Sequence, residues 1–150
     1  MEGVMVRVST LINQLWRDAR FAEQHTKCRR RGCAARMVEL DADDELFSLH
    51  ESLAINGSDF CSSVQGSCGC VHAESLAIVQ TLKTHTDKLH MLLTTLSPCT
   101  QCARLIVESE IVARVIYLRE YRDLRGVQIL RDAGIDVMHA TLWGTHDPVT

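Results

Sequence analysis

Residues 72–102 have the sequence HAESLAIVQTLKTHTDKLHMLLTTLSPCTQC. This stretch predicts the order of secondary structure that the rest of the chain follows. They begin with His72-Ala73-Glu74 and end with Pro98-Cys99-Thr100-Gln101-Cys102. Between these motifs, apolar residues at helical spacing predict a helix over 72–83, and a strongly apolar run predicts a strand over 89–96. The stretch therefore predicts a helix, a strand and the start of a second helix, with an imidazole, a carboxylate and two thiols at its ends.

The segments on either side predict the same alternation. We expect further helices over Val8–Thr26, Cys99–Ser109 and Leu124–Ala133, and strands over Ala34–Leu40, Glu45–Ile55, Val112–Leu118 and Ile135–Thr141, with a turn over Asp41–Asp44. Strands separated by helices imply right-handed crossovers and a parallel section, opened here by an antiparallel hairpin. The predicted fold class is α/β, a three-layer αβα sandwich with a five-stranded mixed sheet, in a single domain over 1–150.

Composition narrows the class of protein. The chain has 150 residues, 46% apolar and 23% charged, with no apolar run approaching the roughly 20 residues that span a bilayer. Residues 1–7 lack a signal-peptide pattern, so we expect no membrane association and a cytoplasmic location, or the host cytoplasm for a viral protein. The net charge of −3 argues against a dedicated binder of nucleic acid polymers. Seven cysteines, an odd count, favour reduced thiols and metal over disulfides.

The two motifs supply the ligands of a catalytic zinc site. His72, Cys99 and Cys102 are three ligands of the types that zinc prefers, and the fourth position stays open for water. Helix N-termini favour thiolate over thiol, and cysteines three apart share a helical face. Glu74 would reach the water as a general acid and base without binding the metal. Taken alone, the Cys-x-x-Cys pair could also be a redox pair or half of a structural zinc site.

The joint pattern is the signature of zinc-dependent nucleobase deaminases. From Cys28 to about Val137 the chain resembles the cytidine deaminase superfamily, and particularly the deoxycytidylate (dCMP) deaminases. The resemblance rests on the segments Cys68–Glu74, Ser97–Ala103, Ile55-Asn56-Gly57 and Tyr117–Asp123. It implies a sheet of cytidine deaminase type and hydrolytic deamination of dCMP to dUMP, in which zinc-activated water attacks C4 and Glu74 shuttles protons.

The resemblance also implies substrate contacts. Asn56 would bond the deoxyribose hydroxyl or the base, and Tyr121 would lie near the phosphate. The Ala73 backbone N–H would bond the pyrimidine carbonyl, and the Ser97 carbonyl would accept from the amino group. Two alternatives stay open at this point, because Asn56-Gly57 is also an ordinary turn pair and Tyr121 could pack only against the core.

The chain departs from the family at two places. Leu76 stands where an asparagine is common, and Ala54-Ile55 precede Asn56 in place of Gly-Tyr. Many dCMP deaminases respond to dCTP and dTTP through that turn, so regulation by these effectors is open here. The run Arg29-Arg30-Arg31 would supply phosphate contacts or form a solvated turn.

The remaining cysteines suggest a second metal. Cys28 follows the first predicted helix, and Cys61, Cys68 and Cys70 crowd the irregular segment 56–71. Similar residues of relatives bind a structural zinc, and a closed site of four ligands would order a loop poor in core residues. The alternative is that these cysteines are small buried hydrophobes. We expect Cys33 to lie in the core.

Other functions stay open within and beyond the superfamily. The substrate could be cytidine or deoxycytidine, a 5-modified dCMP, or guanine, and a zinc-stabilised interaction module without turnover is the alternative from another class. An editing enzyme for tRNA or single-stranded DNA is disfavoured by an aromatic content of 5% and the acidic balance. The family implies a homo-oligomer, commonly a hexamer.

Overall fold

The computed structural model describes residues 5–6, 8–40, 47–65, 67–84 and 88–140. Its elements are β1 (Met5–Val6), α1 (Val8–His25), β2 (Ala34–Leu40), β3 (Phe47–Ile55), α2 (Ala73–Leu82), β4 (His90–Leu96), α3 (Thr100–Ser109), β5 (Val112–Arg119), α4 (Arg125–Asp132) and β6 (Asp136–His139). The predicted helices and strands are all present, and their order is the predicted one. The predicted turn over Asp41–Asp44, the first two residues of the strand predicted over Glu45–Ile55, and the last predicted strand residue, Thr141, lie outside the described residues.

The sheet is mixed, as the alternation of elements predicted. Its strand order is β1-β3-β2-β4-β5-β6. The hairpin strands β2 and β3 are antiparallel, β2 pairs antiparallel with β4, and β4, β5 and β6 are parallel. The predicted five strands are extended by β1, which pairs antiparallel with β3 through Met5 and Val6. A strand of two residues carries no periodicity, so the sequence could not indicate it.

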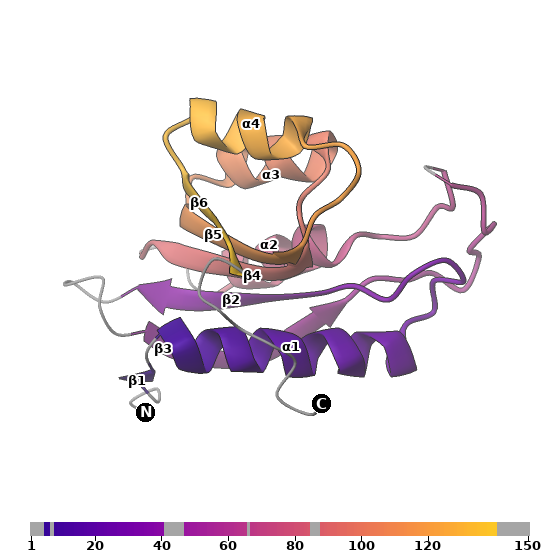
Figure 1. Cartoon of the computed structure of the whole chain (residues 1–150), viewed down its shortest axis with the longest axis horizontal. Coiled ribbons are helices and arrows are strands. Elements are labelled where there is room, and N and C mark those ends of the chain that lie inside the picture. The colour runs from indigo at the N-terminus through magenta and orange to yellow at the C-terminus, as the bar shows by residue number, and fades with distance from the viewer. Residues whose placement is uncertain (1–4, 7, 41–46, 66, 85–87, 141–150) are drawn as a thin grey trace.

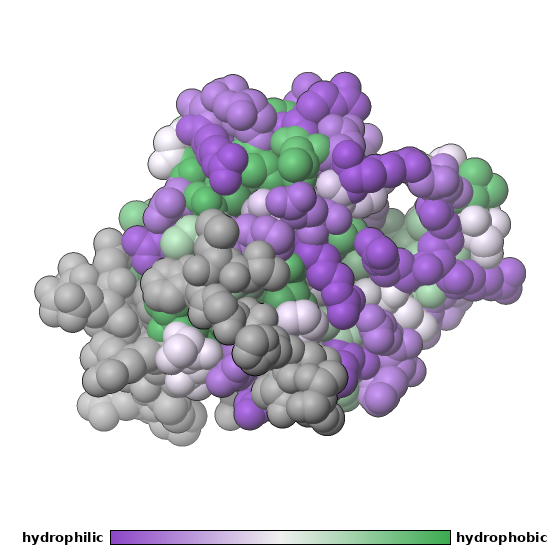
Figure 2. All heavy atoms as spheres, in the orientation of Figure 1, coloured by the Kyte–Doolittle hydropathy of each residue, from purple (hydrophilic) through white to green (hydrophobic). Residues whose placement is uncertain are grey.

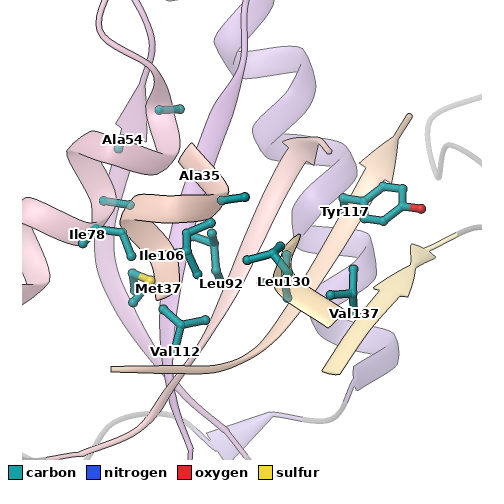
Figure 3. Close-up of a cluster of buried hydrophobic side chains, with 14 of the residues drawn as sticks. Ala35, Met37, Ala54, Ile78, Leu92, Ile106, Val112, Tyr117, Leu130 and Val137 are labelled. Carbon is teal, nitrogen blue, oxygen red and sulfur yellow. The ribbon is translucent and has the colours of Figure 1, made fainter. Parts of the chain in front are cut away.

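Helices cover both faces of this sheet (Figure 1). On one face α1 packs over a cluster that includes Leu11, Leu15, Met91 and Leu93. On the other face α2, α3 and α4 enclose a second cluster, which Figure 3 shows. Its members include Ala35, Met37, Ala54, Ile78, Leu92, Ile106, Val112, Tyr117, Leu130 and Val137. The three-layer αβα sandwich is therefore confirmed.

The central strand explains where the two motifs meet. Neighbouring residues of β4 point to opposite layers, and all but the last of its residues are buried, which accounts for the strongly apolar sequence of the strand. The strand leads directly into the loop before α3, and α2 packs beside α3 on the same face. The starts of both helices are thereby held at one end of the sheet. No helix of the described residues combines the length and apolar character needed to cross a membrane.

Candidate metal and catalytic site

The structure brings together the three predicted metal ligands. His72 is the N-cap of α2 and Cys99 the N-cap of α3, both in extended backbone conformation. The ligand atoms of His72, Cys99 and Cys102 lie within 4.8 Å of one another. His72 Nδ1 is 3.2 Å from Cys102 Sγ and 3.6 Å from Cys99 Sγ. Residues about 30 positions apart therefore converge because two helices start side by side.

These donors fit zinc by their chemistry. One imidazole nitrogen and two thiolates form a zinc donor set with a position left for water. The backbone N–H of Cys102 points at Cys99 Sγ at 3.5 Å, as expected for a thiolate at a helix N-terminus. The Cys102 hydrogen bond, and then that of His72, lowers the pKa of Cys99 to about 4, while the contact with Cys99 raises the pKa of Cys102. Binding of a cation needs both sulfurs as thiolates, so it would release thiol protons.

Glu74 lies beside these donors but is buried. Its side chain is in the first turn of α2, and the residue is 5% exposed. Burial raises the pKa of Glu74, and hydrogen bonds from Thr94 and Cys102 oppose the shift. Thr94 Oγ1 donates to Glu74 Oε1 at 2.8 Å. A carboxyl in this position can exchange protons with a water at the metal position, and its burial keeps it away from bulk solvent.

Thr94 is a contact that the sequence analysis missed. It faces the same layer as Leu92, two residues earlier on β4, because side chains alternate along a strand. Only the packing of α2 on this face brings its hydroxyl to Glu74, 20 residues earlier in the chain.

A glycine on α4 determines how closely that helix approaches the second motif. A Cβ added at Gly126 would overlap the Pro98 carbonyl oxygen and lie 2.8 Å from the Cys99 carbonyl carbon. The first turn of α4 therefore rests on the backbone that carries Cys99. This contact was also missed, because an isolated glycine in a helix gives no signal of what it touches.

We expect Gly126→Ala to lower stability and weaken metal binding, because α4 or the Pro98–Cys99 backbone must move to admit the methyl group. Overpacking of this kind costs about 1–3 kcal/mol, which predicts a fall in melting temperature of roughly 5 °C. Thermal unfolding and zinc content should be measured beside Gln128→Ala, a control at an exposed position of the same helix. Parent-like melting and zinc content in Gly126→Ala would show that this close approach is unimportant.

The second predicted metal group also converges. The sulfurs of Cys28, Cys61, Cys68 and Cys70 lie within 4.8 Å of one another, a spacing compatible with four thiolates around one ion. Cys61 is only 6% exposed, and the Arg29 backbone N–H, 3.4 Å from its sulfur, is the largest cause that lowers its pKa, to about 7. Burial raises the pKa of Cys70. Cys33 lies in the core cluster under α2, as predicted.

The four-cysteine cluster joins the loop 56–71 to the segment after α1. The loop is closed at its base by an antiparallel bridge between Gly57 and Val71, and Val71 directly precedes His72. Within the loop, Ser62 N donates to Cys68 O at 2.9 Å. The cluster therefore holds the segment that leads into the first metal motif.

The four predicted substrate residues lie in three places. Ala73 is the first residue of α2 and 1% exposed. Ser97 and Tyr121 are neighbours at the ends of β4 and β5, where Tyr121 N donates to Ser97 Oγ at 2.6 Å. Asn56 lies at the end of β3, where its amide oxygen accepts from Cys33 N at 2.8 Å.

Asn56 is occupied by structural hydrogen bonds. Its Oδ1 also accepts from Thr26 Oγ1 at 2.9 Å, and its Nδ2 donates to the Arg31 carbonyl at 2.8 Å. An amide NH₂ has two donor hydrogens, so one remains for a ligand. The turn role, which the sequence left open, is thus present.

Comparison with known proteins places this geometry among zinc enzymes. The family model described as the cytidine and deoxycytidylate deaminase zinc-binding region matches residues 19–119, more than half of the chain. The dCMP deaminase of cyanophage S-TIM5, solved with dCMP and dUMP, is similar at 25% identity, over 87% of this chain and 96% of that chain, with a TM-score of 0.67. The fold is also similar to guanine deaminase from Nitrosomonas europaea, at 18% identity, over 95% of this chain and 81% of that one, with a TM-score of 0.62. No curated protein sequence matches.

Proposed function

This chain belongs to the cytidine and deoxycytidylate deaminase zinc-binding family, and from that premise we propose that it hydrolyses dCMP to dUMP and ammonia. The observation that carries the proposal is the convergence of His72, Cys99 and Cys102 beside the buried Glu74 carboxyl. The similar cyanophage enzyme was solved with dCMP and dUMP, which supports this substrate pair.

His72, Cys99 and Cys102 would hold the zinc ion of the family. A zinc ion with three protein ligands lowers the pKa of a bound water to about 7. Glu74 would take a proton from a water at this position and deliver protons to the ring nitrogen and to the departing amino group. Oxygen from water replaces the amino group at C4, and ammonia leaves.

The neighbouring groups would orient the pyrimidine. The Ala73 N–H lacks an intrahelical acceptor in the first turn of α2 and would donate to the pyrimidine carbonyl. The Ser97 carbonyl would accept from the amino group, and Tyr121 would pack against the nucleotide. Asn56 would use its one remaining N–H for the deoxyribose hydroxyl or the base.

Thr94→Val is expected to lower kcat about tenfold with little change in KM, because it removes the hydroxyl that holds Glu74 without changing the side chain's size. Steady-state kinetics on dCMP measure the effect. Thr95→Val is the matched control, since the Thr95 hydroxyl accepts from Ala34 N instead. If Thr94→Val, like Thr95→Val, keeps the kcat of the parent, the Thr94 hydroxyl does not orient Glu74.

The substrate is tested by deamination assays followed by absorbance. We expect the chain to turn over dCMP faster than deoxycytidine, cytidine, dCTP, cytosine or guanine. Guanine belongs in the panel because the similar Nitrosomonas enzyme is a guanine deaminase. If guanine or a free nucleoside is turned over faster than dCMP, that compound replaces dCMP as the proposed substrate. Turnover of none would favour a zinc-stabilised interaction module.

We further propose a second, structural zinc at Cys28, Cys61, Cys68 and Cys70, where four sulfurs converge. We also propose a homo-oligomer, with a hexamer as the family's common form. Apolar side chains exposed at Phe60 (91%), Val79 (46%) and Leu82 (38%) support association. Light scattering tests the assembly, and rate curves with added dCTP and dTTP test whether these effectors act.

A further inference from the structure

A serine hydroxyl lies against one of the two sulfurs of the metal site. Ser75 is in the first turn of α2, one residue after Glu74, and its Oγ is 3.6 Å from Cys102 Sγ on α3. The contact joins the starts of the two helices that carry the metal motifs. Among the described residues, the Ser75 hydroxyl makes no other hydrogen bond. Its one partner is therefore a predicted metal ligand.

Other hydroxyls on these two helices bond to their own backbone instead. Thr81 Oγ1 donates to the Ala77 carbonyl at 2.8 Å, and Ser109 Oγ donates to the Ile106 carbonyl at 2.6 Å. A serine or threonine in a helix can reach the carbonyl three or four residues earlier, so this is an ordinary arrangement. The Ser75 hydroxyl departs from it and bonds across to the neighbouring helix.

The two sulfurs of the site differ in their access to water. The site lies at the end of the sheet from which the loop 56–71 extends (Figure 1), and Figure 2 shows hydrophilic atoms around an opening between that loop and the body. Cys99 is partly exposed and also accepts from the Cys102 backbone N–H at 3.5 Å. Cys102 is only 3% exposed. Water can therefore reach Cys99, whereas the Cys102 sulfur depends on donors from the protein.

Ser75 is the donor that a Cys102 thiolate can use. The thiolate is the metal-binding form of cysteine, and it can only accept hydrogen bonds. His72 Nδ1, 3.2 Å from the sulfur, is itself a predicted ligand atom, and an ionised Glu74 has no proton to donate. The Ser75 hydroxyl does have one. This matters because a buried charged group is costly unless it is hydrogen-bonded.

We propose that Ser75 is a positioning residue of the metal site, whose hydroxyl donates to the Cys102 thiolate and thereby strengthens zinc binding. The hydrogen bond holds the sulfur in one orientation and offsets part of the cost of burying its charge. It also lowers the electron density that the sulfur gives to the metal. The inference rests on the zinc site of the family and not on the choice of substrate.

Competition with a chelator of known zinc affinity measures the effect on binding. Ser75→Ala is expected to bind zinc at the first site roughly tenfold more weakly than the parent. Ser75→Thr keeps a hydroxyl and should restore most of the affinity. Ser109→Ala is the matched control, because it removes a hydroxyl that bonds to its own helix, and it should bind zinc like the parent. Parent-like affinity in Ser75→Ala would overturn the proposal, and so would equal losses in Ser75→Ala and Ser75→Thr.

Cobalt(II) in place of zinc reports on the sulfur itself. Thiolates bound to cobalt(II) give charge-transfer absorption, and a hydrogen bond to the sulfur raises the energy of that transition. Ser75→Ala should therefore shift part of the band to longer wavelength, while Ser75→Thr and Ser109→Ala keep the parent spectrum. The difference spectrum contains only the sulfurs that the substitution affects, so the four-cysteine cluster does not obscure it. An unchanged band in Ser75→Ala would show that the hydroxyl does not donate to Cys102.

Melting of the metal-free proteins separates positioning from a role in folding. Metal-free Ser75→Ala should melt like the metal-free parent, because the hydroxyl matters most when Cys102 carries a charge. A much lower melting temperature would make the loss of affinity a folding effect and overturn the positioning role.

None of these measurements involves a nucleotide. Absent dCMP turnover by the parent would defeat the proposed function and leave the Ser75 role standing. Parent-like zinc binding by Ser75→Ala, in a protein that deaminates dCMP, would defeat the Ser75 role alone.

Discussion

Glu74→Gln is expected to lower kcat for deamination by about 10²–10⁴-fold. Glutamine has the same shape and can still accept from the Thr94 hydroxyl, so the site should keep its geometry. An amide cannot take a proton from water or pass one to the ring nitrogen. Absorbance assays on dCMP measure the loss, and zinc analysis should show the metal content of the parent.

The same substitution should stabilise the metal-free protein near neutral pH. Because burial raises the pKa of Glu74 above its ordinary value, the folded state binds more protons than the unfolded state, and stability falls as pH rises above about 4.5. Glutamine does not titrate, so the Glu74→Gln variant does not lose this stability as the pH rises. Thermal unfolding of both metal-free proteins across pH measures it.

Glu108→Gln is the control for activity, since it removes a carboxylate from an exposed position of α3. It should leave kcat unchanged. Turnover of dCMP by Glu74→Gln at the rate of the parent would refute the assigned proton shuttle.

Cys61→Ser is expected to reduce zinc from two ions per chain to one and to lower the melting temperature by about 10 °C or more. Two apolar side chains of the loop 56–71 add little packing, since Phe60 is 91% and Val64 54% exposed. Structural zinc sites contribute apparent binding free energies of about 10–16 kcal/mol at pH 7. Metal analysis and calorimetry measure both effects.

Cys33→Ala is the matched control, because Cys33 is a core cysteine and lies in neither metal group. It should lose some stability through packing but keep two zinc ions. One zinc per chain in the parent, together with normal folding of Cys61→Ser, would refute the second site. Activity should also fall in Cys61→Ser, because Val71 joins the loop to His72.

The fold was predictable because its signals are local. The spacing of Leu11, Leu15 and Ala19 indicates α1, and the strongly apolar sequence of β4 indicates a strand buried on both faces. β1 was not predictable, because its two residues pair only after β3 is in place. The placement of Asn56 was predicted, but its three structural hydrogen bonds depend on segments brought to it by folding.

The residue types and their short spacings predicted the metal donors and Glu74, because a His-x-Glu triplet and a Cys-x-x-Cys pair each lie within one helical turn. Long-range packing alone placed Thr94 beside Glu74 and Gly126 against Pro98. Each of these contacts joins residues 20 or more positions apart. These residues meet in space because α2, α3 and α4 pack on the sheet, and no local periodicity encodes that arrangement.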